Sequence, residues 1–140
     1  MRPLAATGVL LLAAGCASAQ HGLVRVDLAG PQSGPGSPQE RRLTEAVQHV
    51  AYGGGLVCLE GMGAALLRCS AGAVGNQSHG ITIGLVRSGT GYEVSVDQTT
   101  LLPGGSSQVC STQRRVMEQI DMELAAPVTR VDTRSDCKGK

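Results

Sequence analysis

Aromatic residues are almost absent from this sequence of 140 residues. It contains no Phe and no Trp, and its two tyrosines are Tyr52 and Tyr92. A hydrophobic core must therefore be built from Leu, Val, Ile, Ala and Met, each of which buries less area than an aromatic ring would. The 20 glycines add conformational entropy to the unfolded chain. Such a core is thin for its length, and covalent cross-links would strengthen it.

Several motifs that carry chemistry are also missing. Without a C-x-x-C pair or a C-x-x-C-H motif, a metal site made of thiolates and a covalently bound haem are disfavoured. A phosphate-binding G-x-x-x-x-G-K-[ST] loop and a G-x-S-x-G nucleophile elbow are absent too. His21, His49 and His79 lie far apart without metal-ligand spacing, and His49 is expected to be solvated. We therefore predict no metal and no cofactor.

Neither sign of charge dominates. Twelve Lys and Arg oppose eleven Asp and Glu, which gives a formal net charge of +1. The basic residues are spread along the chain rather than gathered in one cluster. Because nucleic-acid binding leaves a basic patch or stripe, we expect no nucleic-acid partner.

The first 20 residues have the three-part plan of a bacterial signal peptide. One cation, Arg2, precedes an apolar run at 4–14, and small residues follow. As a helix this run would span roughly 16 Å, about half of a ~30 Å hydrocarbon core, so it is too short for a permanent spanning helix. A buried amphipathic helix is the alternative, but the run has no polar face. We expect a signal peptide at 1–19 that is removed on export.

The segment Leu12-Ala13-Ala14-Gly15-Cys16 resembles the lipobox of bacterial lipoproteins, in which a Cys is diacylated on sulfur and becomes the new N-terminus. Ala14 and Gly15 fit that pattern, whereas Ala13 stands where the family usually has Leu. The resemblance implies that residues 1–15 are removed and that Cys16 carries the lipid. Ala17 is not the Asp that retains many such proteins at the inner membrane. The resemblance thus implies an outer-membrane anchor facing the periplasm.

Ordinary secretion is the competing interpretation of the same segment. Ala17-Ser18-Ala19 is an A-x-A site with cleavage before Gln20. Its product would be a soluble periplasmic or secreted protein. The lipobox resemblance covers only the first 20 residues and carries no information about the domain that follows.

The five cysteines fit either form of processing. Cys16 is lipidated in one form and discarded with the leader in the other. Cys58, Cys69, Cys110 and Cys137 remain, an even set in an oxidising compartment. Four cysteines allow three pairings. We expect two disulfides, each worth about 2–4 kcal/mol.

Two short apolar runs at 56–60 and 65–69 favour one of these pairings. Gly61-Met62-Gly63 separates the runs and predicts a hairpin. In that hairpin Cys58 lies opposite Cys69, which makes a cross-strand disulfide geometrically possible. Cys110 would then be left for Cys137.

The strongest local signal after the leader predicts a helix from 38 to 52. Ser37 is an N-cap, Pro38 takes the first helical position and Glu40 completes a capping box. Gly53-Gly54-Gly55 then ends the helix. Its apolar residues recur at i, i+3, i+4, i+7 and i+8 and form one face: Leu43, Ala46, Val47, Val50 and Ala51.

A second amphipathic helix follows Pro103-Gly104-Gly105. Ser106 or Ser107 is expected to cap it, and it runs to about Leu124. Cys110 lies at the edge of the apolar stripe, where it can attach the helix to another part of the chain. The stripe consists of Val109, Val116, Met117, Ile120 and Leu124.

Strand-like alternation accounts for most of the remaining chain. Residues 23–28 form either a short strand or part of a tether at 16–36, which contains a Gly/Pro/Ser-rich stretch. Residues 81–97 predict a second hairpin, and 128–133 can add an edge strand. Together the elements predict an α+β fold in a single domain at 37–137. We expect a small antiparallel meander sheet, two amphipathic helices packed on one face, and disulfides as staples.

Two hypotheses of function follow. The first is a non-catalytic cell-envelope lipoprotein, an accessory, assembly or binding module. It would be attached to the membrane by its lipid and bind an envelope protein through its open sheet face or edge strand. The second is a small exported hydrolase-like enzyme using Ser78, His79 and a carboxylate. Adjacent residues rarely face each other, and Glu60 and Glu93 lie where a strand would expose them. We therefore favour the first hypothesis and assign no catalytic residue.

Overall fold

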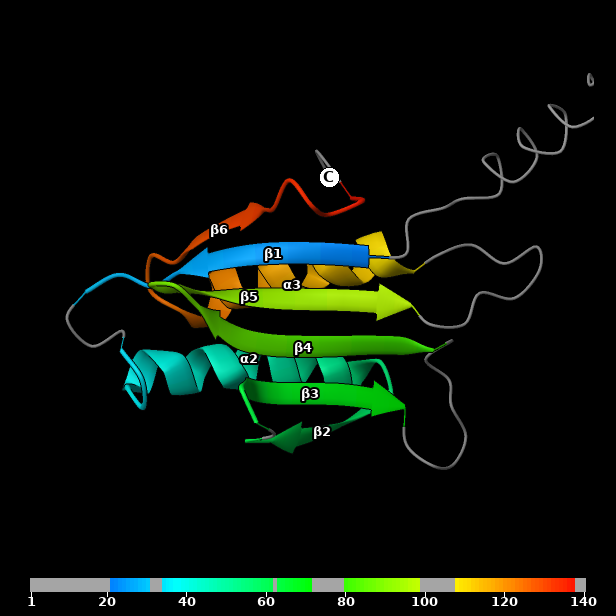
Figure 1. Ribbon diagram of the computed structural model, residues 1–140, viewed down its shortest axis with the longest axis horizontal. Coiled ribbons are helices and arrows are strands. Elements are labelled where there is room, and N and C mark those ends of the chain that lie inside the picture. Colours follow the sequence, from blue (N-terminus) through cyan, green and yellow to red (C-terminus); the bar gives the residue numbers. More distant parts are fainter. Residues whose placement is uncertain (1–20, 31–33, 62, 72–79, 99–107, 138–140) are drawn as a thin grey trace, which may run out of the picture.

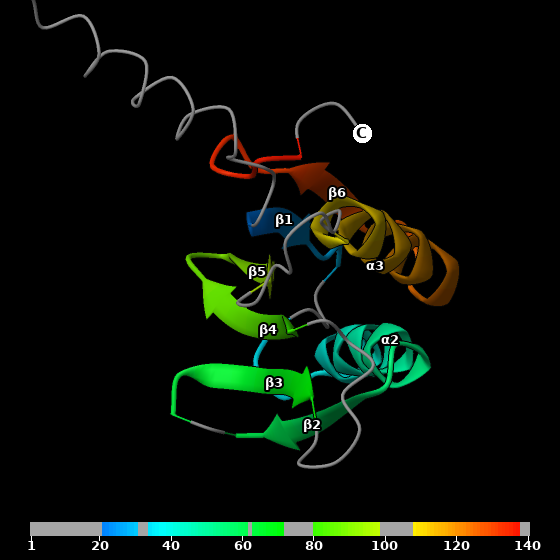
Figure 2. The same cartoon turned by 90° about the vertical axis from the view of Figure 1, so that its right-hand side faces the viewer.

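The computed structural model describes residues 21–30, 34–61, 63–71, 80–98 and 108–137. These residues form one six-stranded antiparallel sheet with two helices packed on one of its faces (Figures 1 and 2), which confirms the predicted α+β class. None of the helices in these ranges is long and apolar enough to cross a membrane. The elements in chain order are β1 (His21–Asp27), α2 (Pro38–Gly53), β2 (Leu56–Glu60), β3 (Ala65–Ala71), β4 (Ile81–Ser88), β5 (Gly91–Gln98), α3 (Val109–Glu123) and β6 (Val128–Val131).

Strand β1 lies inside the sheet and extends the domain toward the N-terminus. The strand order is β2-β3-β4-β5-β1-β6, so β2 to β5 form the expected meander and β1 lies between β5 and β6. Val24 pairs with Val94 on one side and with Val131 on the other. Leu23, Val24 and Val26 are all buried. The segment at 23–28 is therefore part of a strand of the domain, so the described part of the domain extends to His21, beyond the expected start at 37.

The core lies between the sheet and the two helices. Figure 2 shows both helices on the same side of the sheet, and α2 packs on β2 to β4 whereas α3 packs on β5, β1 and β6. The core is aliphatic apart from Tyr92, whereas Tyr52 is exposed. Gly22 in β1 permits the close approach of α3, because a Cβ there would lie 2.6 Å from Oε1 of the buried Gln113.

The start of α2 follows its local sequence signal closely. The Oγ of Ser37 accepts a hydrogen bond from the backbone N–H of Glu40 at 3.1 Å. Glu40 Oε1 accepts in turn from the N–H of Gly36 at 3.0 Å, one residue before the cap. These two bonds satisfy N–H groups that have no partner within the helix or its lead-in turn.

The start of α3 differs from the prediction. Its N-cap is Gln108, which makes no side-chain capping bond, and the helix begins at Val109. The predicted caps, Ser106 and Ser107, lie outside the described residues. Instead of a cap, the backbone N–H of Gln108 donates to Oε1 of Gln98 at the end of β5, at 3.1 Å.

Two disulfides join elements of the domain covalently. Cys58 pairs with Cys69 across β2 and β3, and Cys110 in α3 pairs with Cys137 after β6. Both are the predicted pairs. They attach the terminal strand β2 to β3 and the C-terminal segment to α3.

Candidate functional site

Of the residues named in the hydrolase hypothesis, the structure describes the two candidate carboxylates, Glu60 and Glu93. Ser78 and His79, like the lipidation residue Cys16, lie outside the described residues. Glu60 and Glu93 do not form a carboxylate pair: Glu60 accepts from Gln48 at 3.2 Å, on another part of the sheet. Across 21–30, 34–61, 63–71, 80–98 and 108–137, no three His, Cys, Asp or Glu side chains gather as a metal site.

Glu93 corrects the expectation of a solvated side chain. Its carboxylate is 18% exposed and is held by Arg134 at 2.7 Å and Arg25 at 3.4 Å. Arg25 also donates to the backbone carbonyl of Ser88 at 2.7 Å. These contacts lie on the sheet face opposite the helices, where His21 meets Asp97 at 2.6 Å. This part of the open face is occupied by charges that pair with one another.

His49 is exposed, as expected, but it also has a partner. Its Nδ1 lies 2.5 Å from Oε2 of Glu123, so it links α2 to the end of α3. The contact is an interhelical one at the surface.

Glu40 is the centre of a buried polar cluster that the sequence did not reveal. Its carboxylate accepts two bonds from Arg87, at 2.7 and 2.8 Å, and one from the Tyr92 hydroxyl at 2.8 Å. Oε1 accepts from the N–H of Gly36 and from Arg87, and Oε2 accepts from Arg87 and Tyr92, so each oxygen accepts two hydrogen bonds. The sequence showed Glu40 as a capping residue, but its partners are 47 and 52 residues away, and no local pattern identifies them.

These bonds set the ionisation of the cluster. The hydrogen bonds from Arg87 lower the pKa of Glu40 to about 2, although burial acts in the opposite direction. Burial and the hydrogen bond to the Glu40 carboxylate raise the pKa of Tyr92 to about 12. At neutral pH the carboxylate is ionised and fully hydrogen-bonded. It therefore acts as a structural anchor and is poorly suited to act as a base.

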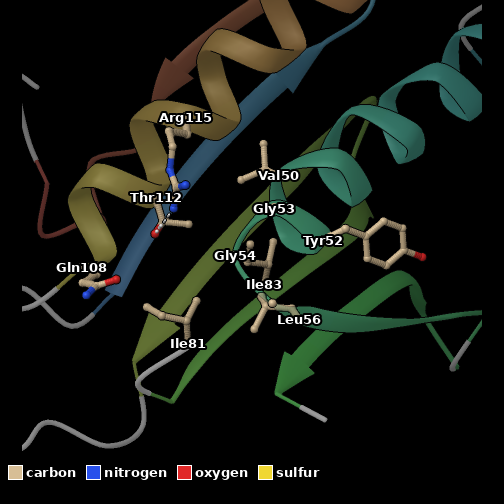
Figure 3. A pocket seen from close by; sticks show the side chains of 11 residues that line it. Val50, Tyr52, Gly53, Gly54, Leu56, Ile81, Ile83, Gln108, Thr112 and Arg115 are labelled. Carbon is tan, nitrogen blue, oxygen red and sulfur yellow. Dashed lines mark hydrogen bonds between the residues drawn. The ribbon is translucent and has the colours of Figure 1, made fainter. Parts of the chain in front are cut away.

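A cleft opens between the C-terminal end of α2 and the first turns of α3 (Figure 3). Its volume is about 490 Å³, within the range of small-molecule sites. Apolar side chains of α2, β2 and β4 form one part of its lining, and polar side chains of α3 form the other. The lining residues are Val50, Tyr52, Gly53, Gly54, Gly55, Leu56, Ile81, Ile83, Gln108, Thr112 and Arg115.

The β2 edge of the sheet is a second candidate surface. Among the described strands β2 is terminal and pairs only with β3. Val57 and Leu59 alternate along it with exposed fractions of 55% and 56%. An unpaired edge that carries exposed apolar side chains is a template for another strand.

The described residues thus define a small α+β domain, stapled by two disulfides, with two exposed apolar side chains on the terminal strand β2, one on the terminal strand β6, and a cleft between its helices. Comparison with protein-family models, curated proteins and solved structures found no match. The two surfaces are therefore interpreted from their own geometry.

Proposed function

We propose that this protein is a non-catalytic cell-envelope lipoprotein that binds another envelope protein by adding a strand of that partner to β2. The leader and Cys16 would direct it to the outer membrane, facing the periplasm. The two disulfides support an oxidising compartment. The observation that carries the binding role is the geometry of β2.

The backbone of β2 offers hydrogen bonds in a defined register. Cys58 and Cys69 are direct partners with their Cα atoms 4.0 Å apart, the short spacing of a pair that exchanges no backbone bonds. The N–H and C=O of Cys58 therefore point away from β3. Because backbone direction alternates, those of Leu56 and Glu60 point the same way. A partner strand would find these groups at the free edge.

The two edges of the sheet are not equivalent. Strand β6 has four residues, carries the charged Arg130, and is followed by a segment held through the Cys110–Cys137 disulfide. Short length and charge are common protections of an edge strand. Strand β2 has five residues, two of them exposed and apolar, and is fixed to β3 by its own disulfide. Binding to a rigid apolar edge loses less conformational entropy than binding to a mobile one, because the edge is already ordered.

Photo-crosslinking in intact envelopes tests this proposal. A photoreactive residue at Leu59 is expected to capture one envelope protein, whereas the same residue at Val128, 54% exposed on β6, serves as the control. Capture from Leu59 that does not exceed capture from Val128 would remove the basis for the proposal.

A backbone variant separates strand addition from simple apolar contact. Glu60→Pro removes an outward N–H at the edge, and Glu60→Ala removes the same side chain but keeps that N–H. We expect Glu60→Pro to lose most of the crosslink and Glu60→Ala to retain it. Equal crosslinking by the two variants would contradict a strand-addition mode.

A further inference from the structure

We propose that the cleft between α2 and α3 binds a small amphiphile with an anionic head group. The head would lie at Arg115, and the apolar part would lie along Leu56, Ile81 and Ile83. This site is separate from the β2 edge and does not depend on the partner proposed above.

The charge of the cleft selects the head group. Among the described residues that line it, Arg115 is the one with a formal charge, and none is acidic. Within the described ranges, the interaction found for its guanidinium is a long hydrogen bond of 3.4 Å to Oγ1 of Thr112. Most of its five N–H donors are therefore available to a carboxylate or phosphate, which suit the guanidinium geometry.

The position of Arg115 places that charge over the cleft. Figure 3 shows its side chain extending toward Thr112, in the direction of the N-terminal end of α3. Long helical side chains point this way because Cα–Cβ bonds tilt toward the helix N-terminus. The positive end of the α3 dipole lies on the same side of the cleft and adds to the attraction for an anion.

The opposite part of the cleft is apolar and rigid. Ile81, Ile83 and Leu56 are at most 5% exposed, and Figure 3 shows them below the polar wall of α3. They belong to the packed core, so they form a preformed floor rather than a flexible one. An apolar lining with a few convergent polar groups is the usual plan of a small-molecule site, and here the charged one is a cation.

Gly53 lines the cleft at the C-terminal end of α2. A Cβ added there would meet no atom within 4 Å. The Cβ of a larger side chain at this position therefore enters open space. Gly53→Leu adds a bulky side chain at a residue that lines the cleft and changes none of the floor residues.

Titration with three ligands of equal chain length tests the proposal. Decanoate, decanol and decyltrimethylammonium are added to the mature domain, and the methyl resonances of Ile81 and Ile83 are followed by NMR. We expect saturable binding of decanoate at least tenfold tighter than that of the other two, and loss of binding in Gly53→Leu. Decanol that binds as tightly as decanoate, or no saturable binding up to about 1 mM, would overturn the proposal.

Two matched arginine variants locate the head group. Arg115→Gln should weaken decanoate at least tenfold and leave decanol unchanged, because only the acid uses the guanidinium. Arg114→Gln removes a positive charge from the preceding residue, which is exposed and does not line the cleft. An equal loss in both variants would show attraction to net charge alone and would overturn the assignment to Arg115.

Discussion

Glu40 connects three elements through a single side chain. It lies in the first turn of α2 and accepts hydrogen bonds from Arg87 of β4 and Tyr92 of β5. A buried carboxylate is tolerated only when hydrogen bonds and an opposite charge replace its hydration. Here both oxygens are satisfied, so the cluster fixes the position of α2 over the sheet.

The same contacts make stability depend on pH. The pKa of Glu40 falls from 4.5 to about 2 on folding. Because the folded value lies below the unfolded one, this stabilisation is complete above about pH 4.5 and is lost as pH falls toward about 2. Expressed as free energy, the whole pKa shift of Glu40 would contribute about 3 kcal/mol to stability. Because the Arg87 side chain is 45% exposed, solvent screening reduces this contribution to about 2 kcal/mol.

Glu40→Gln is therefore expected to lower the free energy of unfolding by about 2 kcal/mol at pH 7, with a smaller deficit at acid pH. Urea denaturation at several pH values measures this. Glu45→Gln is the control, because Glu45 is exposed on the same helix and should change stability by less than about 0.5 kcal/mol. A deficit in Glu40→Gln that does not shrink as pH falls would contradict this role of the ion pair.

At the scale of elements, the two disulfides hold different parts of the domain. The Cys58–Cys69 pair has a sequence separation of 11 and holds β2, whereas Cys110–Cys137 has a separation of 27 and holds the segment after β6. That segment continues the pairing of β6 with β1: Asp132 and Asp136 donate backbone bonds to Leu23 and His21. Each disulfide is thus expected to stabilise its own region as well as the whole domain.

Two double-serine variants separate these regions. From loop length alone, loss of Cys58–Cys69 should cost about 3 kcal/mol, and loss of Cys110–Cys137 slightly more. Hydrogen exchange should rise first in β2 for the former and in β6 and residues 132–137 for the latter. If both variants raise exchange in the same region, the disulfides do not act locally as described.

The predictability of each element follows from the range of its contacts. Ser37, Pro38 and Glu40 form a local signal, so the start of α2 could be predicted to the residue. The start of α3 could not, because Gln108 has no side-chain cap and bonds instead to Gln98. The Cys58–Cys69 pair followed from hairpin register, since period-2 alternation and a short turn fix which residues face each other.

At the scale of the whole molecule, the sequence pattern predicted the α+β fold class but not the order of the strands in the sheet. The alternation at 23–28 indicated a strand, but its place between β5 and β6 depends on pairings about 70 and 100 residues away. The candidate sites share this limit. The β2 edge follows from strand order, and the cleft is assembled from the ends of two helices with the sheet between them.

The proposed function depends on where the domain is held in the cell. A lipid on Cys16 would hold the domain near the outer membrane, and β2 would then meet partners that share the same compartment. Tethering raises the effective concentration of a partner in that layer, so a modest edge interaction is sufficient for binding. A mature chain that begins at Gln20 would instead be the soluble alternative and would lack this advantage.

The intact mass of the natural mature protein, before and after reduction and alkylation, tests the central claim most directly. We predict a chain that begins at a diacylated Cys16, takes up no alkyl groups before reduction, and gains four after it. A chain that still begins at Met1, or one whose four remaining cysteines react without a reductant, would contradict the account of an exported, disulfide-stapled lipoprotein.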